Sequence, residues 1–195
     1  LQGKDLMGIA ETGSGKTAAF VMPILEKLQH AEVKKDRNIQ VLILVPTREL
    51  AIQIDEVFRA FTGNLKREIR TMAVYGGVSI NPQMKGMFGV EVLIATPGRL
   101  LDLIDHKALS ISTIRHLVID EADKMFQLGF GEEMNKLFAM MPVARQTILF
   151  SATLNDKVSE MKERLSIDPV LIEIKKKEAD IENIEQLAYH VSPEN

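Results

Sequence analysis

The chain has 195 residues, with 24 Lys and Arg against 27 Asp and Glu and no cysteine. Hydrophobic residues make up 46% and charged residues 26%, which excludes a disordered, collagen-like or coiled-coil chain. The lack of cysteine excludes disulfide frameworks, thiolate zinc sites and cysteine nucleophiles. The longest stretch without a charged residue, 71–84, is too short and too polar to span a bilayer. We therefore expect a soluble, intracellular protein of one domain or slightly more.

Taken in chain order, short apolar runs alternate with longer amphipathic segments. Two of the runs, 41–45 and 117–119, show no alternation of polarity, which is typical of strands covered on both faces. The apolar runs comprise residues 6–10, 41–45, 70–74, 90–95, 116–119, 147–150 and 170–174. The segments with helical periodicity comprise residues 16–29, 49–61, 132–140 and 156–165. This order predicts an α/β domain with a mostly parallel central sheet and helices on both faces.

A distinctive polar segment follows each of the first six apolar runs. In chain order these segments are residues 11–17, 46–48, 76–77, 96–99, 120–123 and 151–153. Ligands of such sheets bind outside the carboxyl ends of the strands. We therefore expect the six segments to meet at one edge of the sheet. The net charge of −3 gives no support for a large basic surface, so nucleic-acid binding would depend on local residues.

The first polar segment has the pattern of a phosphate-binding loop, because it follows a strand and opens a helix. Its glycines let backbone N–H groups turn toward a di- or triphosphate at the helix N-terminus. Lys16 would reach the β and γ oxygens, and the Thr17 hydroxyl would help to hold Mg²⁺. The alternative is that a Gly-Ser-Gly loop before a lysine is only a flexible turn. The candidate nucleotide-binding residues are Ala10, Thr12, Gly13, Ser14, Gly15, Lys16 and Thr17.

The fifth segment places carboxylates directly after a buried strand. Asp120 lies where it could share a metal ion with Thr17, as in other phosphate-loop enzymes. Glu121 could orient or deprotonate an attacking water. The alternative is that these acids only begin a helix that continues from Lys124.

These segments together resemble the DEAD-box RNA helicases, since residues 120–123 read Asp-Glu-Ala-Asp. Residues 10–17 are similar to the ATP-binding motif of that family, in which Ala is common at the first position. The segments 46–51, 76–77, 96–99 and 151–153 also resemble family motifs, in the same order. The resemblance covers residues 1–174 and implies an N-terminal RecA-like domain of the P-loop NTPase class.

The resemblance assigns a role to each motif. It implies ATP and Mg²⁺ as cofactors. Its catalytic residues would be Lys16, Asp120 and Glu121, and its Mg²⁺ ligands would be Thr17 and Asp120. It implies that Asp123, Ser151 and Thr153 couple nucleotide state to a second domain. RNA would meet residues that touch phosphates and riboses, independently of base sequence. These are Pro46, Thr47, Arg48, Gly77, Thr96, Pro97, Gly98 and Arg99.

Simpler interpretations exist for the RNA-side residues and for the charge runs. Arg48 could pair with an acid at the start of its helix, and Pro97-Gly98 could form only a turn. The Lys66-Arg67 pair is expected to be a solvated charged face. Several methionines are expected to pack in the core or at its rim, namely Met84, Met87, Met125, Met134, Met140, Met141 and Met161.

The resemblance also indicates what the chain lacks. The family motif that recognises adenine lies upstream of the phosphate loop, and residues 1–5 begin just after it. Residues 175–195 are expected to be an interdomain linker followed by the first strand of a second RecA-like domain. Without the arginines of that domain, we expect the chain alone to bind nucleotide weakly, hydrolyse it barely and unwind nothing.

The complete protein is expected to be a monomeric ATP-dependent RNA helicase, with no membrane partner, in the cytoplasm or in a eukaryotic nucleus. Two other functions remain open from the residues. One is a DNA-translocating helicase or another phosphate-loop ATPase. The other is a non-catalytic RNA-binding scaffold that kept the fold but lost the reaction.

Overall fold

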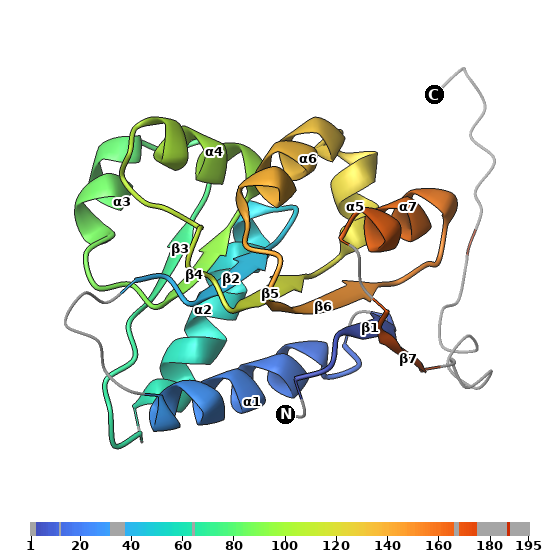
Figure 1. The fold of residues 1–195 in the computed structure, drawn as a ribbon, viewed down its shortest axis with the longest axis horizontal. Helices are drawn as coiled ribbons and strands as arrows, with labels where there is room; N and C mark the ends of the chain where they lie inside the picture. The colour runs from blue at the N-terminus through green and yellow to red at the C-terminus, as the bar shows by residue number, and fades with distance from the viewer. Residues whose placement is uncertain are drawn as a thin grey trace.

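The computed structural model describes residues 3–11, 13–31, 38–63, 65–165, 168–174 and 187. Within these residues, seven strands form one sheet in the order β3-β4-β2-β5-β6-β1-β7, and every pairing is parallel (Figure 1). The strands are β1 (Leu6–Ile9), β2 (Val41–Leu44), β3 (Thr71–Val74), β4 (Val92–Ala95), β5 (His116–Ile119), β6 (Gln146–Ser151) and β7 (Val170–Glu173). The predicted α/β class with a parallel sheet is confirmed.

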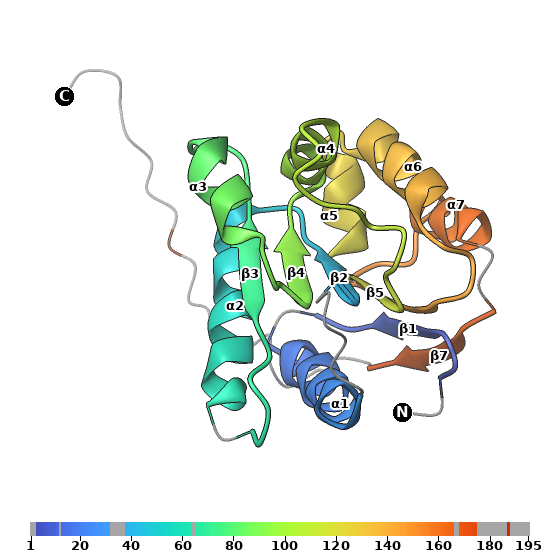
Figure 2. The same cartoon turned by 60° about the vertical axis from the view of Figure 1, so that its left-hand side comes forward.

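Helices cover both faces of this sheet. Helices α1 and α2 lie on one face and α3 to α7 on the other, as the two views in Figures 1 and 2 show. Their bounds are α1 (Lys16–His30), α2 (Arg48–Thr62), α3 (Ile80–Gly86), α4 (Pro97–Asp105), α5 (Ala122–Gln127), α6 (Gly131–Met140) and α7 (Asp156–Arg164). The four helices predicted from periodicity correspond to α1, α2, α6 and α7.

Each central strand contributes side chains to two separate cores. In β2, Val41 and Ile43 pack in the core under α1 and α2, and Leu42 and Leu44 pack in the core under α4, α6 and α7. All four side chains are fully buried. This two-sided burial explains why the run shows no polar alternation, because successive strand residues point to opposite faces.

Three helices were missed by the sequence prediction. Pro97 and Gly98 look like a turn, but Pro97 is the first residue of α4. Proline is suited to that position because the first helical N–H has no partner within the helix. Helix α3 has seven residues and contains Pro82, and α5 has only six residues, so neither is long enough to show a repeated helical pattern.

The expectation that Lys66-Arg67 is a solvated face is wrong for Arg67. Its guanidinium binds the Glu91 carboxylate at two points, with Nη1–Oε1 at 2.9 Å and Nη2–Oε2 at 2.7 Å. The Arg67 side chain is 12% exposed and that of Glu91 is 2% exposed. Arg67 Nε also donates to the Leu28 carbonyl at 3.2 Å. The pair therefore ties the segment before β3 to the segment before β4 and to the end of α1.

Two predictions fall outside what the structure describes. Thr12 is not among the described residues. The predicted linker and strand over 175–195 also lie outside them, apart from Leu187. None of the helices in the described part of the chain combines the length and apolar character that a membrane crossing requires.

Candidate active site

The six polar segments follow the carboxyl ends of parallel strands, and the strand order divides them into two groups. The segments after β5, β6 and β1 are neighbours on one half of the sheet edge. The segments after β2, β4 and β3 are neighbours on the other half. The first group carries the candidate nucleotide residues and the second carries the candidate RNA residues. The chain order does not reveal this division, because the first group combines the segment after β1 with the distant segments after β5 and β6.

The phosphate-loop candidate connects β1 to α1. Gly13 and Gly15 have φ angles of 81° and 84°, a left-handed conformation that residues with a side chain rarely adopt. Gly15 is the N-cap of α1, so Lys16 and Thr17 form the first helical turn. Lys16 Nζ donates to the carbonyl of Ala10 at 2.8 Å, so the side chain folds back across the loop. Loop amides and an ammonium thus gather at one helix N-terminus, which is an arrangement suited to phosphate.

Asp120 follows β5 and is almost completely buried, with 3% of its surface exposed. Its Oδ1 accepts a hydrogen bond from the backbone N–H of Glu121 at 2.9 Å. Burial raises the pKa of the Asp120 carboxyl, and the positive charge of Lys16 opposes that rise. A nearby cation stabilises the ionised form of this buried carboxyl group.

The donor set fits a magnesium ion that is shared with phosphates. Among the described residues, no group of three His, Cys, Asp or Glu side chains could hold a metal ion. Mg²⁺ in nucleotide sites needs no such group, because one or two protein oxygens suffice when phosphates and waters supply the rest. The Thr17 hydroxyl and the Asp120 carboxylate are oxygens of that type.

Glu121 adopts an unusual backbone conformation. Its φ of 52° and ψ of 50° lie in the left-handed region, and it precedes the first residue of α5. For a residue with a side chain this costs on the order of 1–3 kcal/mol, and such strain is concentrated at functional sites. The Glu121 carboxylate contacts Lys124 Nζ, at 3.0 Å from Oε2 and 3.1 Å from Oε1.

The three residues predicted to couple nucleotide state to another domain lie in contact. Asp123 Oδ2 accepts hydrogen bonds from the N–H and the hydroxyl of Thr153, at 3.1 and 3.0 Å. The Ser151 hydroxyl donates to the Thr153 carbonyl at 2.7 Å. The Ser151 carbonyl in turn accepts from the N–H of Ala10 at 3.0 Å. The segments after β5, β6 and β1 are therefore joined by hydrogen bonds.

On the other half of the edge, Arg48 is exposed and lies over an aromatic ring. Its guanidinium carbon is 5.0 Å from the centre of the Tyr75 ring, a cation–π distance. Thr47 caps the same helix by accepting from the N–H of Leu50 at 3.3 Å. Gln83 holds Tyr75 through two hydrogen bonds to its backbone, both at 3.2 Å. Tyr75 and Gln83 were not predicted from the sequence, although an aromatic residue directly after a predicted strand was a usable signal.

Arg99 is buried instead of open to solvent, with 8% of its surface exposed. Its Nη2 donates to the Val78 carbonyl at 2.7 Å, and its Nε lies 3.6 Å from Asp102 Oδ2. Gly77, just before Val78, has a φ of 78°. Arg99 therefore fixes the segment after β3 against the first turn of α4. Thr96 and Pro97 are buried beside it, whereas Gly76 and Gly77 are exposed.

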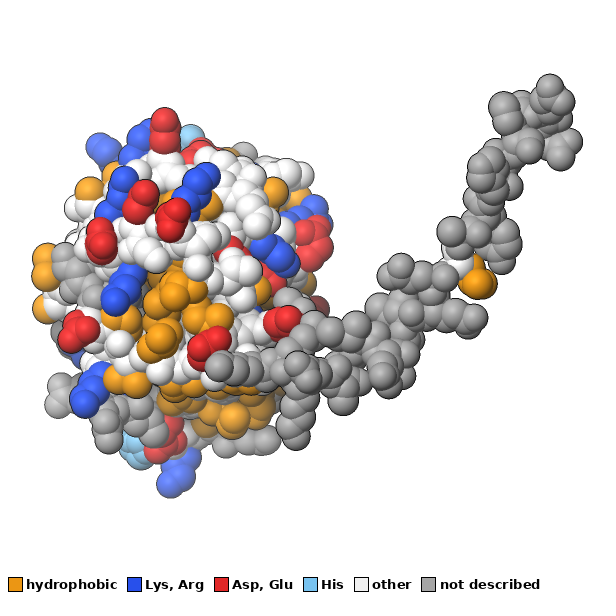
Figure 3. Space-filling model, turned by 90° about the vertical axis from the view of Figure 1, so that its right-hand side faces the viewer, with side chains coloured by type: hydrophobic (Ala, Val, Ile, Leu, Met, Phe, Trp, Pro, Cys, Tyr) orange, Lys and Arg blue, Asp and Glu red, His pale blue; other side chains and the backbone are white. Residues whose placement is uncertain are grey.

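An apolar hollow of about 170 Å³ borders the phosphate loop. Ser14, Gly15 and Lys16 form its polar side. The apolar lining consists of side chains from β1, β6, β7 and α1 and the residue after β7, including Phe20, Phe150, Ile172 and Ile174. Figure 3 shows hydrophobic side chains exposed over this end of the molecule, where β7 leaves Val170, Leu171 and Ile172 about half exposed.

A phosphate loop on a parallel sheet, with a buried acid at the end of a strand two positions away in the sheet, defines a P-loop NTPase domain. Residues 1–161 match the DEAD/DEAH box helicase family, and the chain belongs to that family. The resemblance to its N-terminal RecA-like domain is thereby confirmed. A solved DEAD box protein from the hyperthermophile Methanococcus jannaschii superposes with a TM-score of 0.79 at 31% identity, over 88% of this chain and 46% of the other.

Two curated relatives show how much of a longer protein the chain matches. It is 42% identical over 187 residues to the ATP-dependent RNA helicase CshA of Listeria monocytogenes, which is 95% of this chain and 35% of the relative. It is 38% identical over 192 residues to the RNA helicase CrhR of Synechocystis, which is 98% of this chain and 38% of the relative. The chain therefore spans roughly a third of the length of these relatives.

Proposed function

We propose that this chain is the ATP-binding domain of an ATP-dependent RNA helicase, and that ATP and RNA bind to the two halves of one sheet edge. The division of the polar segments into two neighbouring groups carries this proposal. In the complete protein, ATP binding and hydrolysis would be coupled to RNA binding and to local unwinding of a duplex. The names of the relatives support RNA as the nucleic acid.

The nucleotide half has the groups that phosphoryl transfer to water requires. The loop amides and Lys16 would bind the phosphates, with the Lys16 ammonium leaving the Ala10 carbonyl for a phosphate oxygen. Thr17 and Asp120 would hold Mg²⁺, which supplies positive charge to the β and γ oxygens. Glu121 would accept a proton from the attacking water. For that, its carboxylate must leave the ion pair with Lys124.

The RNA half has exposed groups that suit a phosphate backbone. Arg48 is exposed, and Thr47 has its hydroxyl at a helix N-terminus. The exposed backbone of Gly76 and Gly77 leaves room for close approach. Arg99 would act mainly by holding this segment in place, because its guanidinium is buried. Such contacts read phosphates and riboses, so binding would be largely independent of sequence.

The chain alone would be a poor enzyme. An arginine supplied to the γ-phosphate is worth about 10³–10⁵ in rate, and in this proposal it comes from a second RecA-like domain. Recognition of adenine would depend on residues upstream of the phosphate loop. We expect weak nucleotide binding and almost no hydrolysis from residues 1–195. Strong RNA-stimulated ATP hydrolysis by this chain would contradict the half-site argument.

The deciding experiment compares ATP hydrolysis by the complete protein in the presence of RNA and of DNA with the same sequence. Stimulation by RNA alone supports the proposal. Equal stimulation indicates a DNA-translocating helicase or another P-loop ATPase. Titrating RNA with and without an ATP analogue excludes the scaffold alternative, because a non-catalytic scaffold would bind RNA equally in both cases.

A further inference from the structure

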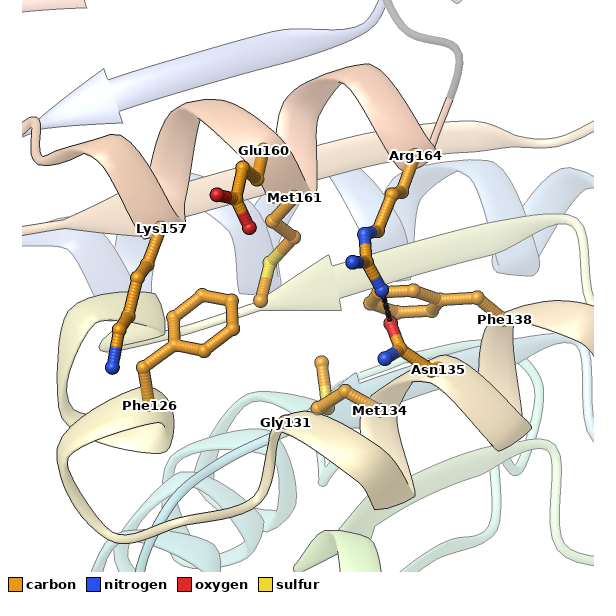
Figure 4. Close-up of a pocket in the computed structure, with 9 residues that line it drawn as sticks. All are labelled: Phe126, Gly131, Met134, Asn135, Phe138, Lys157, Glu160, Met161 and Arg164. Carbon is orange, nitrogen blue, oxygen red and sulfur yellow. Dashed lines mark hydrogen bonds between the residues drawn. The ribbon is translucent and has the colours of Figure 1, made fainter.

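A second hollow lies away from the candidate active site, between α5 and α6 on one side and α7 on the other (Figure 4). Its volume is about 170 Å³. Its apolar lining comes from all three helices: Phe126, Met134, Phe138 and Met161. Met134 and Met161 are 1% exposed and form the floor, whereas the two phenylalanines are partly exposed. We call this hollow the α6–α7 groove.

The size and lining of the α6–α7 groove suit one large apolar side chain. An apolar cavity of about 150 Å³ can hold a benzene ring. Methionine is flexible and polarizable, and it is frequent in surfaces that adapt to an inserted side chain. In Figure 4 the side chains of Phe126, Met134 and Met161 converge in the space between α5, α6 and α7.

The rim of the groove carries charges with a definite spacing. Lys157 and Arg164 lie near the two ends of α7, seven residues apart, and Glu160 lies between them. Arg164 Nη1 donates to the Asn135 side chain, so this guanidinium reaches from α7 to α6 (Figure 4). Seven residues of helix correspond to about 10 Å, so the two cations flank the apolar hollow at a distance of two helical turns.

We propose that the α6–α7 groove binds an acidic amphipathic helix of a partner protein. One large apolar side chain of that helix fills the hollow, and carboxylates on both sides of it pair with Lys157 and Arg164. The spacing defines the partner sequence as an acid at position i, an aromatic or leucine at i+4, and a second acid at i+7, since these lie on one helix face. This inference does not depend on the proposed function, because the groove exists whether or not the chain binds nucleotide.

The positions of the methionines allow a direct binding assay, because Met134 and Met161 line the groove. The chain is labelled at the methyl groups of its ten methionines, and their NMR signals are followed during titration with designed alanine-based helical peptides. The first peptide has Glu, Phe and Glu at i, i+4 and i+7. A second has Lys in place of both Glu residues, and a third has Ser in place of Phe. Met22, half exposed on α1 at the opposite face of the sheet, is the internal control.

The expected result is that only the Glu-Phe-Glu peptide shifts the Met134 and Met161 signals, with Met22 unchanged. Equal binding of the Lys-Phe-Lys peptide, equal binding of the Ser peptide, or no shift with any peptide would overturn the proposal. Shifts that appear on concentrating the chain alone would show self-association instead. Shifts with an RNA oligonucleotide and not with the peptide would show a nucleic-acid site instead.

Gly131 provides a variant that fills the groove without distorting it. It lines the hollow, and a Cβ added there would lie 3.8 Å from the Phe126 ring, an ordinary contact. The Gly131→Met variant should fold normally, and its affinity for the Glu-Phe-Glu peptide should be lower by about tenfold or more. Gly63→Met is the matched control, because Gly63 is exposed and has no atom within 4 Å of the added Cβ. Unchanged affinity in Gly131→Met would overturn the proposal.

The charges are tested separately by reversing them. Replacing Lys157→Glu and Arg164→Glu together leaves the apolar lining intact, and both side chains are exposed. This variant should no longer bind the Glu-Phe-Glu peptide and should bind the Lys-Phe-Lys peptide instead. A circular dichroism spectrum and melting temperature equal to those of the unmodified chain show that folding is preserved. Retained preference for the acidic peptide would refute the assigned role of the two cations.

Discussion

Asp123 accepts two hydrogen bonds from Thr153, one from the backbone N–H at 3.1 Å and one from the hydroxyl at 3.0 Å. The two residues are 30 positions apart and follow neighbouring strands, β5 and β6. Asp123 is 5% exposed, so its carboxylate depends on these donors in place of water. The contact joins the acidic segment after β5 to the segment after β6, so a displacement of one segment would also displace the other.

Replacing Thr153→Val removes the hydroxyl donor and keeps the backbone N–H. A hydrogen bond to a charged group contributes about 1.5–3 kcal/mol, so the joint between the two segments should weaken. We expect the complete protein to bind nucleotide almost normally but to lose most of the tightening of RNA binding by an ATP analogue. The measurement is RNA affinity with and without the analogue, and Thr62→Val on the opposite side of the sheet is the control.

The central strands β2 and β4 were predictable because burial on both faces is reflected directly in their unbroken apolar sequence. Leu42, Ile43 and their neighbours are apolar without alternation, and the structure buries them all. The polar segments at the strand ends were predictable for a related reason, since parallel strands place all their carboxyl ends at one edge. Their division into two halves was not predictable, because strand order depends on long-range pairing such as β2 with β4 and β5.

Individual side-chain partners were the least predictable features. Arg67 resembles a solvated residue in sequence, and only the approach of Glu91, 24 positions away, buries it. The hydrogen bond from Arg99 to the carbonyl of Val78, 21 positions away, likewise has no signal in the local sequence. Short-range patterns carry no information about such partners, because the fold alone brings them together.

Lys16→Ala and Glu121→Gln should separate binding from reaction. Removing the Lys16 ammonium takes away the cation of the phosphate loop, so nucleotide binding by the complete protein should fall below detection. Glu121→Gln keeps the shape of the side chain but removes the proton acceptor, so binding should persist while turnover falls by about 10²–10⁴. Fluorescent-nucleotide titration and steady-state hydrolysis measure the two effects. Normal turnover in Glu121→Gln would exclude that residue from the reaction.

His116 should make folding stability depend on pH. Burial lowers the pKa of its imidazole, and the nearby positive charge of Lys27 lowers it further. The unfolded chain binds a proton near the ordinary value of 6.5, whereas the folded chain does so only at a lower pH. At a pH between the two pKa values the unfolded chain binds a proton that the folded chain does not, so acidification favours unfolding. The folded state therefore has its full stability above about pH 7 and loses part of it as the pH falls below 6.5.

The His116→Gln variant should remove this part of the pH dependence. Urea unfolding of both proteins between about pH 7.5 and 5 gives the difference in unfolding free energy at each pH. The unmodified chain should lose more stability on acidification than the variant does. His30→Gln is the control, because its ring is exposed on α1. A difference that is constant with pH would contradict the lowered pKa.

Removing only one member of the Arg67–Glu91 pair should lower the free energy of unfolding more than replacing both members does. Arg67→Met leaves the Glu91 carboxylate, only 2% exposed, without its guanidinium partner. Loss of one member of a buried pair costs about 3–5 kcal/mol, because the remaining charge stays in a poorly solvating interior. Lys66→Met, one residue earlier and exposed, should change stability by less than about 0.5 kcal/mol.

The double variant Arg67→Met with Glu91→Gln distinguishes charge from packing. It removes both charges while keeping side chains of similar length, so it should be more stable than Arg67→Met alone in urea unfolding. If the double variant is as unstable as the sum of the two single variants, the pair acts through independent packing contacts. Recovery of stability in the double variant indicates that the buried Glu91 charge, once the Arg67 guanidinium is removed, is the main cause of the instability.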